Sequence, residues 1–155
     1  MTETGPAPYR HIACCVDDSY AARAAAAEAA RLRDLGPGRL SLVHVIERPP
    51  LPALVAEGAA WYPDEREYES RARAWLADLA RDFRAEPVLL TGYPPAAAAE
   101  WAERAGVDLL VAASHRGRVE RLLLGSFASY LARHAPCAVL LVRPPAAAGG
   151  GEGVP

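Results

Sequence analysis

The sequence predicts an α/β fold: one doubly wound, five-stranded parallel sheet with helices on both faces, Rossmann-like in its general plan. Three observations predict it. Five short apolar runs alternate with segments of helical periodicity, which is the pattern of consecutive βαβ units. Each run is apolar nearly throughout, as a strand must be when helices cover both faces of its sheet. The length of 155 residues suits a single domain that buries its core without disulfides or metal.

The five predicted strands are rich in valine, isoleucine and leucine. They span residues 11–16, 39–47, 87–91, 107–113 and 137–142. In open parallel sheets, ligands bind beyond the carboxyl ends of the strands, where the strand order reverses. This rule selects three segments as candidate binding regions, namely 17–19, 45–47 and 113–127.

Four predicted helices connect these strands. They span residues 20–35, 64–83, 96–106 and 127–135. The first is rich in alanine and stops at Gly-Pro-Gly. In the second, Tyr68, Trp75, Leu76 and Phe83 recur on one helical face, opposite a charged face. Residues 92–95, Gly-Tyr-Pro-Pro, are predicted to form a turn before the third helix.

Charge and hydropathy exclude several function classes. The net charge is −2, and all 17 basic residues are arginines without an extended basic stripe, so nucleic acid is not an expected partner. No apolar run approaches the roughly 18 residues that cross a bilayer, so no membrane association is expected. The chain begins without a basic segment followed by a long apolar one, which predicts a cytoplasmic protein.

The cysteines and histidines indicate neither disulfide nor metal chemistry. Cys14, Cys15 and Cys137 are interpreted as small buried apolar residues, because an odd number of cysteines does not suggest a disulfide framework. The four histidines lack the spacing of metal ligands.

Residues 1–8 and 144–155 show no apolar periodicity, and we predict two flexible tails around a domain at 9–143.

Several segments, taken in order, resemble the universal stress protein family. "IACCVDDSYAA" resembles the family's first strand and the aspartate that follows it, and "LSLVHVIE" resembles its second strand. "TGYPPAAAAEWAERAGVDLLVAAS" resembles its Gly-x-Pro turn, helix and fourth strand. The most specific segment is "RLLLGSFASYLARHAPCAVLLVR", with Leu-Leu-Gly-Ser before a helix and His-Ala-Pro-Cys before an apolar strand.

This resemblance implies a sheet in the order 3-2-1-4-5 and an assembly with a second copy. The fifth strand would lie at a sheet edge, and an apolar edge strand is rarely left bare. A homodimer is therefore expected through Ala138, Val139, Leu140, Leu141 and Val142. Many members of the family bind ATP between the first and fourth strands, and others bind none.

The resemblance also implies a set of nucleotide-binding residues, each with a simpler alternative role. Asp17 matches an aspartate that contacts the adenosine, although it could serve only as a turn or cap residue. Val45 matches an apolar position near the adenine, although it could be plain core. Gly125 and Ser126 match the end of the family's pattern Gly-x2-Gly-x9-Gly-Ser/Thr, although Ser126 could only cap its helix.

The chain departs from that pattern before Gly125. Counted back without a gap, the two earlier glycines of the family fall on Ala112 and His115. With one residue deleted, they fall on Ala113 and Arg116. Neither alignment supplies a glycine, which would let the backbone approach a phosphate closely or take positive φ.

Two interpretations of this loop remain open. In one, Gly117 provides the turn, and Arg116 or Arg118 supplies positive charge to phosphates. In the other, the loop has lost its ligand and its arginines are solvated. The second predicts a dimeric interaction module in stress adaptation that has an unidentified protein partner and weak or no ATP binding.

The alternative function is an ATP-binding regulatory module, with magnesium on the nucleotide, whose loop 113–126 holds the phosphates. Neither function requires a catalytic residue, and hydrolysis of ATP would be slow at most, because no lysine is present to act on the phosphates. The alternative function would use Asp17, Val45, Ala113, Arg116, Gly117, Arg118, Gly125, Ser126 and Phe127.

Overall fold

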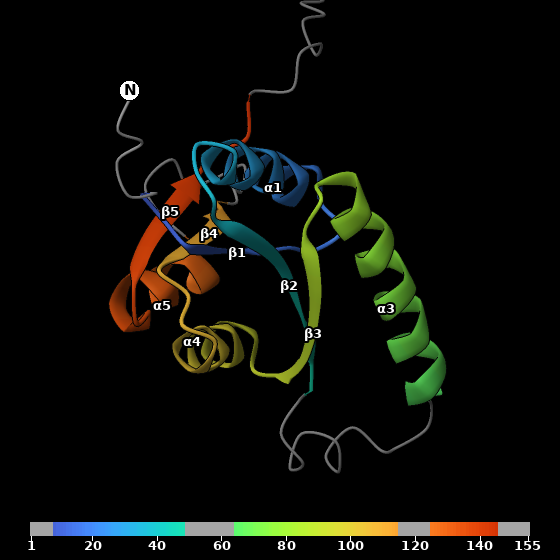
Figure 1. The fold of residues 1–155 in the computed structure, drawn as a ribbon. Helices are drawn as coiled ribbons and strands as arrows, with labels where there is room; N and C mark the ends of the chain where they lie inside the picture. Colours follow the sequence, from blue (N-terminus) through green and yellow to red (C-terminus); the bar gives the residue numbers. More distant parts are fainter. Residues whose placement is uncertain (1–7, 49–63, 115–124, 146–155) are drawn as a thin grey trace, which may run out of the picture.

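The computed structural model describes residues 8–48, 64–114 and 125–145, which form a five-stranded sheet with four helices. The strand order is β3-β2-β1-β4-β5, and every neighbouring pair is parallel, as predicted (Figure 1). The strands are β1 (His11–Cys15), β2 (Arg39–Glu47), β3 (Glu86–Gly92), β4 (Leu109–Ala113) and β5 (Ala138–Val142). Strand order therefore reverses between β1 and β4.

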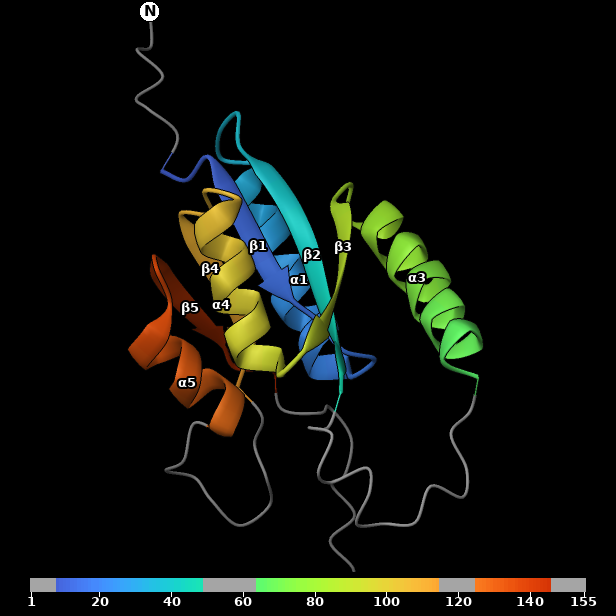
Figure 2. The same cartoon turned by 90° about the horizontal axis from the view of Figure 1, so that it is seen from below.

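Two helices cover each face of the sheet. Helices α1 (Tyr20–Arg33) and α3 (Glu65–Asp82) pack on one face, and α4 (Pro94–Arg104) and α5 (Ser126–His134) pack on the other (Figure 2). None of these helices has the length and apolar character that crossing a bilayer would require.

The core consists of two apolar clusters. The α1 cluster lies on the face covered by α1 and α3, and the α4–α5 cluster lies on the opposite face. Because successive strand residues point to opposite faces, Cys14 lies in the α1 cluster and Cys15 packs against the α4–α5 cluster. The prediction that all three cysteines are buried holds for Cys14, but Cys15 and Cys137 are only half-buried. Cys15 is the last residue of β1, and Cys137 directly precedes β5.

Several predicted boundaries differ by one or two residues, and two of the differences have identifiable reasons. Helix α4 begins at Pro94, inside the predicted turn, because proline suits the first helical positions, where no N–H is needed. Strand β4 begins at Leu109 rather than at residue 107. Asp108 instead turns its carboxylate to the start of β1, where it accepts from the backbone N–H groups of Arg10 (2.8 Å) and His11 (3.0 Å).

A polar network that the sequence did not predict is buried at the amino end of the sheet. The His11 ring is only 4% exposed, with Nε2 2.8 Å from the Ser41 hydroxyl and Nδ1 3.2 Å from the Ala105 carbonyl oxygen. Burial lowers the pKa of His11, and the nearby Arg39 guanidinium lowers it further, while the Ala105 hydrogen bond opposes them. The fold therefore favours the neutral imidazole.

This network predicts a loss of stability in mild acid. In the unfolded chain His11 takes up a proton near its ordinary pKa of about 6.5, whereas in the folded chain it does so only at lower pH. Its contribution to stability is thus present above about pH 6.5 and declines as the pH falls below it. We expect urea unfolding between pH 7.5 and 5.5 to show a smaller decline in His11→Gln than in wild type. The matched control, His134→Gln, replaces an exposed histidine and should keep the wild-type decline; equal declines in all three proteins would contradict the assignment.

Candidate functional site

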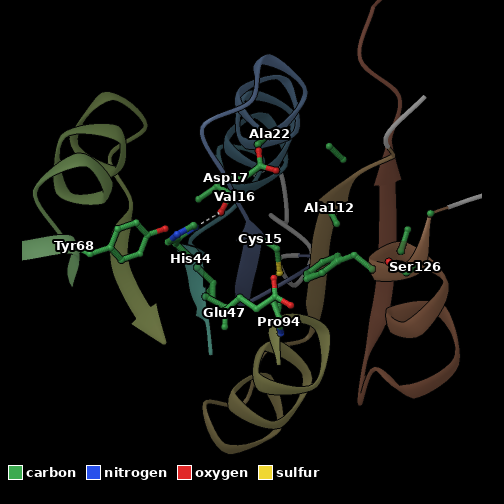
Figure 3. A pocket seen from close by; sticks show the side chains of 16 residues that line it. Cys15, Val16, Asp17, Ala22, His44, Glu47, Tyr68, Pro94, Ala112 and Ser126 are labelled. Carbon is green, nitrogen blue, oxygen red and sulfur yellow. Dashed lines mark hydrogen bonds between the residues drawn. The ribbon is translucent and has the colours of Figure 1, made fainter. Parts of the chain in front are cut away.

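A cavity of about 560 Å³ lies at the carboxyl ends of β1, β2 and β4, at the reversal of strand order. Its walls come from these strands, from the turn after β1, from the first residues of α4 and α5, and from one residue each of α1 and α3. This is the place where open parallel sheets bind their ligands. Figure 3 shows the side chains that surround it.

Six of the nine sequence-predicted residues line this one cavity. They are Asp17, Val45, Ala113, Gly125, Ser126 and Phe127. The other three, Arg116, Gly117 and Arg118, lie outside the described residues. Segments more than 100 residues apart in sequence thus meet at one site, as the strand order requires.

The N-terminus of α5 opens into the cavity without a side-chain cap. Gly125 is the N-cap residue, with φ +70° and ψ 158°, a backbone region that is essentially restricted to glycine. The first hydrogen bond of the helix runs from the Ser129 N–H to the Gly125 carbonyl, at 3.0 Å. The N–H groups of Ser126, Phe127 and Ala128 therefore precede the helical ladder, and all three residues line the cavity.

This geometry decides one alternative left open by the sequence. Ser126 is the first residue of the helix, one position later than a capping serine would stand. It does not cap α5, and the helix begins one residue earlier than predicted. The positive end of the helix dipole and a cluster of N–H groups thus face the cavity, an arrangement that attracts an anion.

Asp17 has the turn role that the sequence suggested for it, and it also lines the cavity. One carboxylate oxygen, Oδ1, accepts from the Ser19 N–H at 2.9 Å and holds the turn after β1. Ser19 then caps α1 by accepting from the Ala22 N–H at 3.1 Å. Since Asp17 also lines the cavity, the turn fixes a carboxylate at the wall of the site.

The end of β2 supplies the opposite wall. Val45 packs with the α4–α5 cluster and also reaches the cavity, so it is both a core residue and a lining residue. His44 points to the other face of the sheet, where its ring meets Trp75 edge-on at 5.2 Å. Its Nδ1 lies 2.8 Å from the Val16 carbonyl oxygen and must carry the proton, because a carbonyl only accepts.

The sequence model of the universal stress protein family matches residues 8–143. The chain belongs to this family. The match covers every strand and helix described above and agrees with the resemblance seen in the sequence.

Solved structures of other universal stress proteins share its fold. UspA from Lactobacillus plantarum is 24% identical, with a TM-score of 0.62 over 89% of this chain and 100% of that one. A universal stress protein from Archaeoglobus fulgidus in complex with dAMP is 20% identical, with a TM-score of 0.59 over 86% of this chain and 97% of that one. A universal stress protein in complex with cAMP is 21% identical, with a TM-score of 0.57 over 86% and 96%.

Cysteine 15 of this universal stress protein forms part of the cavity wall but is not a reactive group. Burial raises the pKa of the Cys15 thiol to about 12. The residue is therefore a neutral thiol at physiological pH, and a thiol is a poor nucleophile and a poor metal ligand. We assign it the role of an apolar contact.

The charged groups on the described part of the cavity wall are acidic. Asp17 and Glu47 contribute carboxylates, and no arginine lies among the described lining residues. In the ranges that the structure describes, no group of three or more histidine, cysteine or acidic side chains is arranged to hold a metal ion.

Of the lining residues that were not predicted as site residues, three carry a carboxylate, an imidazole or a phenol: Glu47, His44 and Tyr68. Glu47 ends the segment 45–47 that the strand-end rule had selected, so the rule alone could have identified it. His44 was read only as a strand residue. Tyr68 was counted on the apolar face of its helix, but it is 52% exposed and lines the cavity from the α3 side (Figure 3).

Proposed function

We propose that this universal stress protein is a nucleotide-binding regulatory module that acts as a homodimer in stress adaptation and binds its nucleotide weakly. The observation that carries the proposal is the uncapped N-terminus of α5, which opens into a 560 Å³ cavity at the reversal of strand order. The nucleotides in the dAMP and cAMP complexes of related structures support the choice of ligand class.

The residues of the cavity fit a nucleotide in one orientation. A phosphate group belongs at the N–H groups of Ser126, Phe127 and Ala128, where the helix dipole favours negative charge. The sugar and base then extend across the ends of β1 and β2. Magnesium would be held by the phosphates rather than by a protein cage, as is usual for this ion.

Weak affinity follows from the electrostatics of the same cavity. The Glu47 carboxylate on the cavity wall repels a polyphosphate and so lowers its affinity. Rapid hydrolysis is also not expected, because the chain has no lysine to stabilise charge that develops on a transferred phosphoryl group. The protein would act through its nucleotide-dependent conformation and its contacts with a protein partner.

The proposed dimer uses β5. This strand pairs only with β4 in the described sheet, and its side chains are exposed at Ala138 and half-buried from Val139 to Val142. An apolar edge strand with unpaired backbone groups is a template for pairing with a second copy. We place the protein in the cytoplasm, a reducing compartment that suits its three free cysteines.

A nucleotide-free interaction module is the second candidate function. The observation that favours it is that Ala112 and Ala113 both line the cavity, since the family's first glycine falls on one or the other of them, depending on the alignment. An alanine methyl there reduces the room for close approach of a phosphate to the backbone.

Calorimetric titration of the purified protein with ATP and with GTP, each with magnesium, tests the proposed function. We expect saturable binding with a dissociation constant on the order of 100 μM or weaker. An absence of binding for both nucleotides at several millimolar would reject nucleotide binding and leave the interaction module as the better account. Dissociation constants below about 10 μM would reject the weak-affinity part of the proposal.

A further inference from the structure

The two ends of the cavity have opposite hydrogen-bonding character. At the α5 end, the backbone of Ser126, Phe127 and Ala128 offers N–H donors. At the β2 end, the charged group is the carboxylate of Glu47, which only accepts. In Figure 3, Ser126 and Tyr68 lie on opposite sides of the cavity, and Glu47 lies between them in this view.

Glu47 has no competing partner in the structure as described. Its neighbour Arg48 pairs instead with Glu65, at 3.9 Å. Within residues 8–48, 64–114 and 125–145, the Glu47 carboxylate makes no hydrogen bond or ion pair. By the alternation of β2 it shares the face of Val43 and Val45, which turns it toward α4 and the cavity. Both carboxylate oxygens are therefore available to a ligand.

The strand order determines which part of a nucleotide reaches Glu47. A phosphate at the start of α5 lies beside β4, and β1 separates β4 from β2. With strands 4.7–4.9 Å apart, the end of β2 is about 10 Å from the end of β4. In the chemical order phosphate, sugar, base, the sugar then lies over β1 and the base lies over the end of β2.

We propose that Glu47 selects the base of the nucleotide and prefers guanine to adenine. This inference rests on the proposed function, since it assumes that the cavity binds a nucleotide. The edge of guanine carries two adjacent donors, the ring N1–H and the exocyclic amino group, which match the two oxygens of a carboxylate. The edge of adenine carries one amino donor beside the lone pair of N1, so one carboxylate oxygen would face another acceptor.

A substitution of Glu47 by glutamine distinguishes this role from others, because it changes the donor pattern without changing the shape of the side chain. An amide offers one acceptor and one donor, which is the pattern that complements adenine. We therefore expect Glu47→Gln to weaken binding of GMP and to strengthen binding of AMP. Opposite changes for two ligands of equal charge cannot arise from the loss of electrostatic repulsion, which would strengthen both.

The experiment is a titration of ¹⁵N-labelled protein with GMP, IMP and AMP, followed by backbone amide shifts. For wild type we expect GMP to bind about tenfold more tightly than AMP, the effect of one charged hydrogen bond in a partly exposed site. IMP keeps N1–H but lacks the amino group and should lie between them. Glu103→Gln, which removes the same charge from the last turn of α4, is the matched control and should leave this order unchanged.

Each outcome of the titration bears on the assignment. Equal affinities of wild type for GMP and AMP, or a parallel change of both in Glu47→Gln, would overturn the role of Glu47 while leaving nucleotide binding intact. A lower melting temperature of Glu47→Gln with an unchanged GMP preference would assign Glu47 to stabilising the positive end of α4, and would also overturn it. If none of the three nucleotides binds, both this inference and the proposed function fail.

Discussion

Replacing Gly125 with valine is expected to weaken nucleotide binding at least about 30-fold, equivalent to about 2 kcal/mol. Gly125 has φ +70° and ψ 158°, a combination that a residue with a Cβ avoids, and that a β-branched residue avoids most strongly. A Cβ built on Gly125 meets no atom of the described residues within 4 Å. The substitution therefore acts through the backbone and not through a clash with the core.

The reason for so large an effect is the position of Gly125 as the N-cap of α5. A change of its backbone angles redirects the N–H groups of Ser126, Phe127 and Ala128, which are the donors that we assign to the phosphate. A valine side chain would also stand beside those donors, where the described residues leave open space.

Gly117→Val is the informative comparison. Gly117 lies outside the described residues, and in the sequence it falls one position beyond the place of the family's second glycine. We expect its replacement to change affinity by less than about threefold. Titration of wild type, Gly125→Val and Gly117→Val with ATP and magnesium, with melting temperatures as a check on folding, measures both effects. If Gly117→Val abolishes binding while Gly125→Val retains it, the loop before Gly125 is rebuilt around Gly117 and the anion site is misassigned.

The fold could be predicted because each apolar run of this chain fits one kind of element, a strand of a parallel sheet. A segment such as "VDLLVAA" is too short for a membrane and too apolar for a sheet with an open face, so it fits a strand covered by helices on both sides. The boundaries were less predictable because single side chains set them. Asp108 leaves the apolar run to bind the start of β1, and Pro94 begins a helix in what reads locally as a turn.

The candidate site was predictable only in part. Residues that stand at a strand end or a helix start could be identified from the sequence, and the others could not. Asp17, Val45 and Gly125 follow from strand ends and a helix start, and the structure places them in one cavity. Tyr68 could not be identified, because helical spacing alone does not distinguish a residue that packs on the sheet from one that lines the cavity. The His11–Ser41 pair was also hidden, because it joins residues 30 positions apart through the register of two strands.

Replacing Val139 with proline is expected to weaken the proposed homodimer at least about 30-fold. The Val142 carbonyl accepts from the Ser114 N–H at 2.9 Å, so Val142 directs its backbone groups toward β4. Backbone groups alternate along a strand, so the N–H and C=O of Val139 point away from β4, toward the free edge. Proline at 139 therefore removes an edge donor without breaking the β4–β5 ladder.

The size of the effect follows from symmetry. In a twofold dimer every substitution is present twice, and two lost hydrogen bonds of about 1 kcal/mol each correspond to about 30-fold in the dissociation constant. The proline rings add steric repulsion at the edge. Sedimentation velocity over a range of micromolar concentrations should show a dimer for wild type and a shift toward monomer for Val139→Pro.

The opposite edge of the sheet provides a matched control. The Gly92 carbonyl accepts from the Arg48 N–H at 3.4 Å and faces β2, so the neighbouring Thr91 directs its N–H to the free edge of β3. Thr91→Pro also removes a backbone N–H donor, but from the edge of β3, which takes no part in the proposed interface. It should therefore leave the dimer intact. A wild-type protein that stays monomeric at these concentrations would reject the dimer. Dissociation by Thr91→Pro with no effect of Val139→Pro would place the interface on β3 and reject the assignment to β5.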